Sequence, residues 1–155
     1  LFVRAASGRK RHNVLGALDA VTHRLIRVTN DGYINAESVC ALLRAVAGAA
    51  VGLPITLVLD NARYQRNAVV QALAKELDIH LLFLPSYSPN LNLIERLWRF
   101  LKGKALYGRY HPQFADFRAA IERELAQLST THRASLQSLM THNFQQFTNV
   151  SLLAA

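Results

Sequence analysis

One cysteine is all that this 155-residue sequence contains. A disulfide within the chain is therefore impossible, which excludes a small disulfide-stabilised secreted domain and fits a reducing compartment. The cysteine, Cys40, stands in the apolar stretch of residues 38–43. Because of these neighbours, we interpret it as a buried structural thiol rather than a nucleophile.

Long apolar runs are also missing. The longest uncharged one spans residues 45–59, is interrupted by Gly48, Gly52 and Pro54, and is shorter than the roughly 20 residues that a membrane helix needs. Residues 1–12 turn polar and basic at once, so they do not resemble a signal peptide. The chain begins with Leu rather than Met, as expected of a fragment.

Acidic residues are scarce: 10 of them face 18 lysines and arginines, which gives a net charge of +8. Such an excess favours a polyanionic partner, with nucleic acid first and an anionic membrane surface second. A basic protein with no special partner stays an open alternative. Hydrophobic residues make up 51% of the chain, which is enough for the core of one domain.

Apolar patterning predicts an α/β domain. Residues 13–21 and 23–28 are expected to pair as a hairpin, and residues 79–84 to form a strand. The short run at residues 55–59 is typical of a strand that is buried on both faces. Helices are expected at residues 36–50, at 65–77 with Val69, Leu73 and Leu77 on one stripe, at 93–106 and at 114–128.

Asp60 follows directly after the strand of residues 55–59. Ligands of open α/β sheets collect at the carboxyl ends of strands, so this position favours a functional acid. The structural alternative is a turn residue, because Asp-Asn after a strand is common loop chemistry.

Glu95 has two structural alternatives of its own. Asn92 and Glu95 have the spacing of a capping box, and Arg99 could form an ion pair one turn further along the helix. The strand before Glu95 neighbours the strand that ends at Asp60, so the two carboxylates can converge at one edge of the sheet. Such carboxylates repel unless a cation joins them, and hard oxygen ligands suit Mg²⁺ or Mn²⁺.

Three segments, at residues 57–73, 81–102 and 107–121, resemble the mariner-related insertion-sequence transposases of bacteria, which are DDE-type transposases. In that family an Asp precedes an Asn or a nearby turn. A leucine-proline-x-tyrosine-serine-proline loop then leads into leucine-asparagine-proline-isoleucine-glutamate, which opens a helix. Asp60 matches the second catalytic acid and Glu95 the third, with 34 residues between them as is typical of the group.

The resemblance covers most of residues 8–128 and implies a ribonuclease H-like α/β fold, a mixed sheet flanked by helices. It divides the chain into a partial DDE catalytic domain, residues 1–128, and a C-terminal helical tail, residues 129–155. It also implies metal-dependent DNA strand cleavage and strand transfer, with two Mg²⁺ or Mn²⁺ ions held by three carboxylates. The expected partners are double-stranded DNA, as transposon ends and target, and a second copy in the full-length protein, in the bacterial cytoplasm at the nucleoid rather than on a membrane.

The sequence departs from the family in three places. The opening strand with the first catalytic Asp is absent, and Asp19, which matches the second strand, is not expected to replace it. Gln65 stands where the family often has His, and Leu93 replaces a Pro that the first helical position favours without requiring it. The missing strand is expected to leave a poorly paired, aggregation-prone gap between the hairpin and the parallel strands.

Two alternatives to a DNA-transposing enzyme follow. The chain could be a truncated, catalytically inactive remnant that only binds DNA, or a ribonuclease H-like nuclease unrelated to transposition. Tyr87 could stack on a base or pack in its loop, and Trp98 is expected in the core. The histidines lack the spacing of zinc ligands. Basic residues beside Glu95 are expected to contact phosphates: Arg96, Arg99, Lys102, Lys104 and Arg109.

Overall fold

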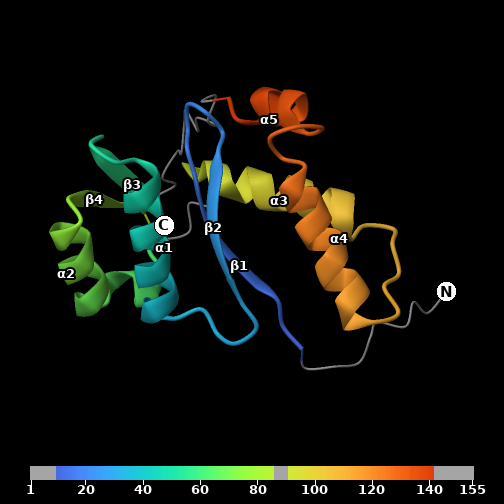
Figure 1. Cartoon of the computed structure of the whole chain (residues 1–155), viewed down its shortest axis with the longest axis horizontal. Helices are drawn as coiled ribbons and strands as arrows, with labels where there is room; N and C mark the ends of the chain where they lie inside the picture. Colours follow the sequence, from blue (N-terminus) through green and yellow to red (C-terminus); the bar gives the residue numbers. More distant parts are fainter. Residues whose placement is uncertain (1–9, 86–90, 142–155) are drawn as a thin grey trace, which may run out of the picture.

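The computed structural model describes residues 10–85 and 91–141. Figure 1 shows strands and helices alternating along the first part of the chain and helices alone in the last part. The elements in chain order are β1 (Asn13–Leu18), β2 (Leu25–Asn30), α1 (Ala36–Ala49), β3 (Ile55–Leu59), the 3₁₀ helix η1 (Arg63–Arg66), α2 (Ala68–Glu76), β4 (Ile79–Phe83), α3 (Leu93–Ala105), α4 (Phe114–Ala126) and α5 (Arg133–Leu139).

Strands β1 and β2 form the predicted antiparallel hairpin, with register from Asn13 opposite Asn30 to Leu18 opposite Leu25. The first strand ends earlier than the predicted residue 21, and the second begins and ends two residues later than predicted, because residues 19–24 form the turn. Asp19 Oδ1 accepts hydrogen bonds from the backbone N–H groups of Val21, at 2.8 Å, and Thr22, at 2.9 Å. The N–H groups of Thr22 and then Val21 hold the pKa of the Asp19 carboxyl below its ordinary value. Asp19 therefore stabilises a turn.

The hairpin is covered by helices on both faces. Alternate side chains point to opposite sides, so Leu15 and Ala17 pack towards α1 while Val14 and Leu18 pack towards α3 and α4. Gly16 allows the hairpin to pack closely against α3. A Cβ on that residue would lie 2.8 Å from Leu25 Cδ1 and 3.2 Å from the Trp98 ring. Trp98 is thus part of the interior, as predicted, although it is only partly buried.

Strands β3 and β4 form a parallel pair connected through α2, with Leu59 opposite Phe83 at the carboxyl end. Helices α1 and α2 cover one face of this pair. On the other face Val58 is 41% exposed and Leu82 48% exposed. The prediction of a strand buried on both faces is therefore wrong: among the described residues only one face of β3 has a helical layer, although its sequence is apolar except for Thr56.

The single helix predicted at residues 65–77 is divided in the structure. Residues 63–66 form η1, and α2 begins only at Ala68, after Asn67 in an extended conformation accepts a hydrogen bond from Val69 N at 2.9 Å. This start places Val70, Leu73 and Ala74 inward and leaves Val69 64% exposed. The predicted stripe is therefore wrong at Val69.

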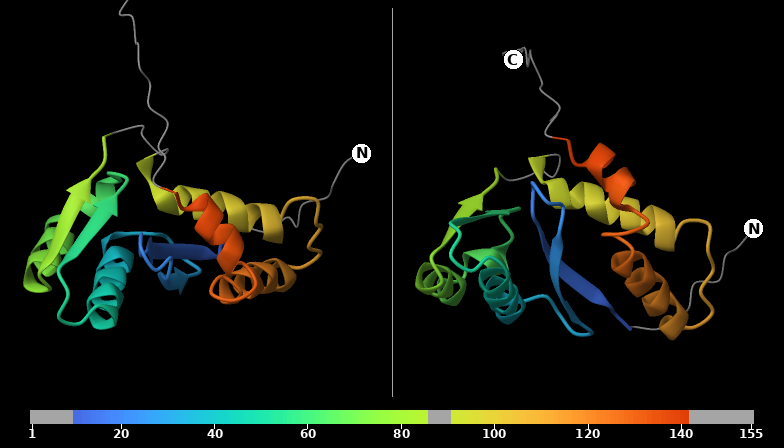
Figure 2. Two further views of the ribbon diagram at one scale, coloured as in Figure 1. Left: turned by 90° about the horizontal axis from the view of Figure 1, so that it is seen from above. Right: turned by 45° about the horizontal axis from the view of Figure 1, so that its top comes forward.

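The antiparallel and parallel pairs both belong to the predicted mixed α/β fold, but within residues 10–85 and 91–141 they are not hydrogen-bonded to each other. Helix α1 joins them, because Leu42 and Val46 pack with residues of β1 and β2 and also with Ile55 and Leu57 of β3. Figure 2 shows α1 beside both pairs. The separation matches the gap expected from the sequence, whereas the aggregation expected from it stays a prediction.

Helices α3, α4 and α5 form the second core. The helix predicted at residues 93–106 is confirmed as α3, with Leu97, Leu101 and Ala105 buried. Leu136 of α5 is also buried in this core, so part of the predicted tail at 129–155 packs on the catalytic domain predicted to end at 128. That domain boundary stays a prediction. Helix α4 ends at Ala126 rather than at the predicted Leu128. Among the described helices, none has the length and apolar character needed to cross a membrane.

Candidate active site

Asp60 lies where the parallel pair ends. Beyond the last paired residues, Leu84 N donates a hydrogen bond to Leu59 O at 2.8 Å. Asp60 is the next residue, and its side chain is exposed. The chain then turns sharply through Asn61, whose φ of 73° is in the left-handed region that Asn tolerates. Asp60 therefore stands at the carboxyl edge of the sheet, where the strand pattern predicted it.

Gln65 holds the Asp60 carboxylate in place. Its Nε2 donates to Asp60 Oδ1 at 2.6 Å, and its Oε1 accepts from Ala62 N at 2.9 Å. Gln65 is only 6% exposed, whereas Asp60 is exposed, so the bond joins a buried amide to a carboxylate at the surface. Gln65 thus fixes one carboxylate oxygen of Asp60 and leaves Oδ2 without a partner among the described residues. This contact is not predictable from the motif, in which Gln65 only stands where the family often has His.

Two neighbours complete the surroundings of Asp60. Burial raises the pKa of the Tyr64 phenol above its ordinary value, and the negative charge of Asp60 raises it further. Arg66 Nε donates to Asn61 Oδ1, and the guanidinium lies 4.6 Å from the centroid of the Phe83 ring. These contacts fix the turn after β3 without forming an ion pair with Asp60.

Glu95 is the third residue of α3. Asn92 caps the helix by accepting from Ile94 N, although at a long 3.4 Å. The reciprocal bond of a capping box is not formed, and no ion pair joins Glu95 to Arg99 among the described residues. Both structural alternatives for Glu95 are therefore unsupported. Its carboxylate has no protein partner in the described part of the chain.

Asp60 directly follows β3, and Glu95 lies in the first turn of α3. Figures 1 and 2 show the first turn of α3 on the same side of the molecule as the carboxyl ends of β3 and β4. Residues 86–90, including Tyr87, lie outside the described residues, so the predicted role of that loop is not tested. Within residues 10–85 and 91–141, no group of three or more His, Cys, Asp or Glu side chains could hold a metal ion.

The donor chemistry of Asp60 and Glu95 fits a hard divalent cation, because each carboxylate offers at least one uncommitted oxygen. Two carboxylates are nevertheless fewer than the three that the family resemblance implies. Asp19 does not supply the third, since its Oδ1 is bound within the hairpin turn. The roles of Asp60 and Glu95 as metal ligands thus stay a prediction.

The basic residues around α3 divide into two kinds. Arg96 Nη1 donates to the carbonyl oxygens of Leu139, at 3.1 Å, and Thr141, at 2.6 Å, so it secures the end of α5. Lys104 Nζ lies 5.6 Å from the Phe100 ring centroid. Exposed side chains that form no ion pair within the described residues are those of Arg99, Lys102 and Arg109.

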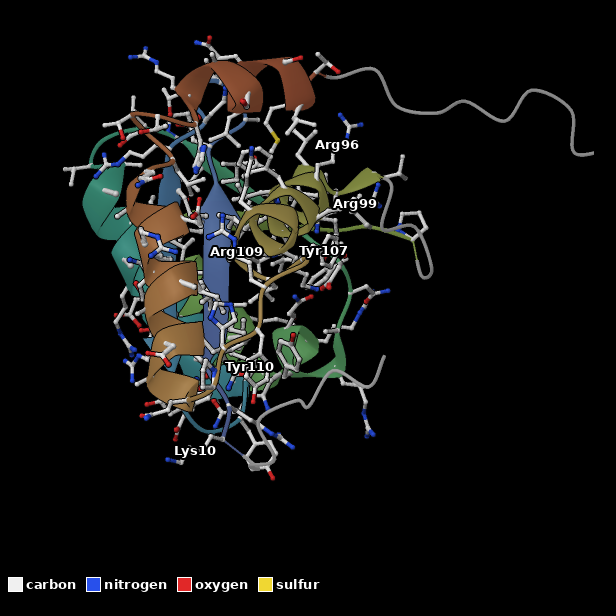
Figure 3. The ribbon with its side chains drawn as sticks, turned by 90° about the vertical axis from the view of Figure 1, so that its right-hand side faces the viewer. Lys10, Arg96, Arg99, Tyr107, Arg109 and Tyr110 are labelled. Atoms are coloured by element: carbon white, nitrogen blue, oxygen red, sulfur yellow. The ribbon has the colours of Figure 1, made fainter. Side chains whose placement is uncertain are left out.

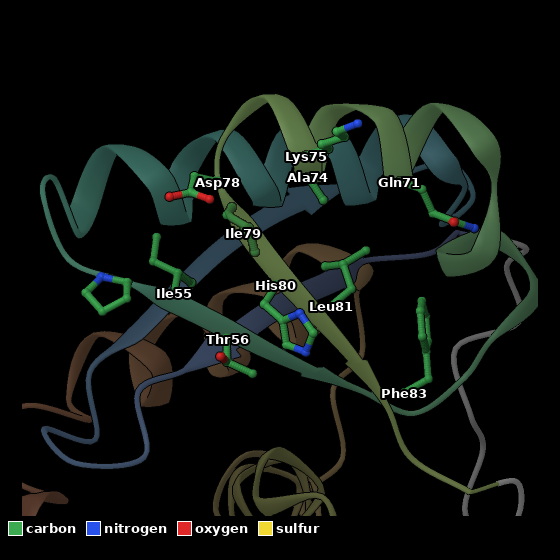
Figure 4. A pocket seen from close by; sticks show the side chains of 11 residues that line it. Ile55, Thr56, Gln71, Ala74, Lys75, Asp78, Ile79, His80, Leu81 and Phe83 are labelled. Carbon is green, nitrogen blue, oxygen red and sulfur yellow. The ribbon is translucent and has the colours of Figure 1, made fainter.

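A pocket of about 520 Å³ lies away from these acids. Figure 4 shows its lining from the amino end of β3, from β4 as far as Phe83 and from α2, and it includes Lys75, Asp78 and His80. Neither Asp60 nor Glu95 lines it.

The mixed α/β arrangement of the elements, with helices beside two small sheets, is that of a ribonuclease H-like fold. The structure of the Mos1 transposase catalytic domain and raltegravir with Mg is similar to this chain, with a TM-score of 0.50 and 14% sequence identity over 90% of this chain and 84% of that one. The comparison with curated proteins found no match.

The model of the DDE superfamily endonuclease family matches residues 3–118. The chain belongs to this family. The family resemblance and the ribonuclease H-like fold predicted from the sequence are thereby confirmed.

Proposed function

We propose that this chain is the catalytic core of a DDE transposase, which cleaves DNA strands and joins them to a target with Mg²⁺ or Mn²⁺. The observation that supports this most is the pair Asp60 and Glu95: both follow the family pattern, and neither carboxylate is neutralised by a basic side chain among the described residues. An acid that serves the fold usually has a partner, as Glu122 and Glu124 do here.

In this proposal Asp60 and Glu95 hold the metal ions, and Gln65 keeps the Asp60 carboxylate in one orientation. When bound, the ions supply an activated oxygen nucleophile and stabilise the leaving oxygen in an in-line phosphoryl transfer. The cations Arg99, Lys102 and Arg109 contact phosphates of the duplex and hold it in register. In the complete protein, two copies would bring two DNA ends together at the nucleoid.

A second function is favoured by one observation: the described residues offer no third carboxylate beside the pair. A remnant that binds DNA without cleaving it would have this property. The two proposals share the DNA partner and differ only in strand cleavage.

Nicking of supercoiled plasmid in Mn²⁺ tests the enzyme. We expect the full-length protein, rather than this chain alone, to cleave, and to lose cleavage on Asp60→Asn and on Glu95→Gln, each of which removes a charge and keeps the shape. Asp78→Asn is the matched control, because Asp78 is an exposed acid with a φ of 54°, which Asn tolerates, at the opposite end of the parallel pair.

Cleavage that survives both substitutions would sink the metal-ligand roles. DNA binding without any metal-dependent cleavage would support the inactive remnant. Cleavage of RNA–DNA hybrids in preference to duplex DNA would favour a nuclease unrelated to transposition.

A further inference from the structure

The connection between α3 and α4 exposes two aromatic rings. Tyr107 is 69% exposed and Tyr110 54% exposed, and neither phenol has a hydrogen-bond partner among the described residues. Large aromatic surfaces left in water are a common mark of binding sites, since a ring that served only the fold would be packed against it. The two tyrosines are separated by Gly108 and Arg109.

The first tyrosine is held in place by the end of α3. Tyr107 N donates to Lys102 O at 3.2 Å, and the ring lies close to Gly103, where a Cβ would be 3.9 Å from Tyr107 Cδ2. Gly108 follows with a φ of 70°, in the left-handed region that favours glycine. The chain reverses at this point, so the helix end itself turns the ring outward.

The second tyrosine is fixed from the other side. The ring of His111 packs edge-on against Phe117 of α4, with centroids 6.1 Å apart, and its Nε2 lies 3.1 Å from Ala105 O. The residue next to Tyr110 is therefore tied to both helices. Exposure of Tyr110 thus results from anchored backbone, which lowers the conformational entropy lost when a ligand binds.

Uncompensated positive charge surrounds the rings. Figure 3 shows Arg99, Tyr107, Arg109 and Tyr110 on one face of the molecule, with Lys10 at its lower end. None of the three cations forms an ion pair among the described residues, in contrast to Arg27 and Arg118, which do. We call these five residues the tyrosine face.

We propose that the tyrosine face binds unpaired DNA bases, which stack on Tyr107 and Tyr110 while Arg99, Arg109 and Lys10 neutralise the phosphates. Aromatic rings interleaved with cations suit a polyanion whose bases expose their flat faces, and such stacking tolerates any base sequence. In an intact duplex these faces are covered by neighbouring pairs. The inference rests on the proposed function for its DNA partner, and adds that the partner includes a single-stranded or distorted segment.

Equilibrium binding of fluorescent oligonucleotides to the full chain tests the proposal. A single strand and the duplex of the same length are titrated in EDTA, so that neither metal ligands nor cleavage affects the result. Tyr107→Ala and Tyr110→Ala should each weaken single-strand binding by about tenfold and leave duplex binding nearly unchanged. The Tyr→Phe variants should retain their affinity, because the ring persists.

Tyr33→Ala is the matched control: that tyrosine is also exposed, but lies under the guanidinium of Arg11. Arg109→Gln should weaken both DNA forms and reduce the salt dependence of binding by about one ion.

Three results would overturn the inference: equal losses on single strand and duplex, no loss on either, or a loss in the Phe variants as large as in the Ala variants. If the Ala variants instead abolish self-association in sedimentation and keep DNA affinity, the face is a protein interface and the inference fails. Absence of all DNA binding would refute the proposed DNA partner as well, whereas selective results bear on the face alone.

Discussion

The two buried or partly buried glutamates of α4 have basic partners, whereas Asp60, after β3, and Glu95, in the first turn of α3, have no basic partner among the described residues. His132 Nε2 lies 2.7 Å from Glu124 Oε2, and Arg27 Nη1 lies 2.7 Å from Glu122 Oε2. Asp60 has one amide donor, and Glu95 has no partner in the described residues. The difference distinguishes two glutamates that contribute contacts to the fold from two acids whose carboxylates keep uncommitted oxygens among the described residues.

The polar contacts of α4 also link segments that are distant in the sequence. His12 lies 2.9 Å from Glu122 through Nε2 and 3.4 Å from Asp31 through Nδ1, while Arg118 donates to Asp31 at 3.1 Å. Strands β1 and β2 are thereby joined to α4 by a continuous polar network. No buried polar side-chain atom lacks a partner within the described residues, as is typical of a structural network.

The largest expected effect is a loss of folding stability on substitution of His132, the partner of Glu124. His132→Ala leaves the Glu124 carboxylate buried without its closest partner and removes the edge-on contact of His132 with Phe100. We expect a loss of about 3 kcal/mol in the free energy of unfolding, measured by urea denaturation. Glu124→Gln keeps a hydrogen-bonding group of the same shape and should cost about 1 kcal/mol. Equal, small losses for both variants would show that the pair contributes little.

The sequence could predict the elements and the family, but not the contacts that distinguish these two pairs of acids. Each strand and long helix was expected close to its observed place, because apolar periodicity records which face is buried. The prediction that β3 is buried on both faces was wrong, since an apolar strand sequence does not reveal how many helical layers cover the strand. The break before Ala68 was missed because Arg63–Arg66 continues a helical composition.

The site shows the same limit. Motif spacing predicted Asp60 and Glu95, whereas the role of Gln65 depends on a 3₁₀ turn that brings its amide back to the preceding strand. The pairing of Glu122 with His12 and Arg27 joins residues far apart in the sequence, and no local pattern marks it. The exposure of Tyr107 and Tyr110 likewise follows from the left-handed turn at Gly108.

A smaller effect concerns Glu122 and depends on pH. Burial alone would raise the pKa of its carboxyl, but hydrogen bonds from Arg27 and His12 outweigh burial and hold the pKa below its ordinary value of 4.5. A lowered folded-state pKa stabilises the fold above the unfolded pKa, and this gain is lost as pH falls through the folded value. Glu122→Gln should therefore cost about 1 kcal/mol near neutral pH and progressively less below about pH 4.5.

Urea unfolding of both proteins across this range gives the measurement. Glu76→Gln, a change at an exposed glutamate without an ion pair in the described residues, is the control and should show no such trend. A difference between Glu122→Gln and the unaltered chain that stays constant with pH would contradict the assignment.

The smallest expected effect on stability is at Asp60 and Glu95. It tests most directly whether these acids differ from the paired glutamates of α4. Asp60→Asn keeps an oxygen for the Gln65 amide, and Glu95→Gln removes no protein contact, so both should unfold within about 0.5 kcal/mol of the unaltered chain. Mn²⁺ should raise the unfolding midpoint of the unaltered chain more than that of either variant, because only the unaltered pair supplies two charges to a cation. A loss above about 2 kcal/mol for either variant without metal would place that acid among the structural ones, and the two pairs of acids would no longer differ.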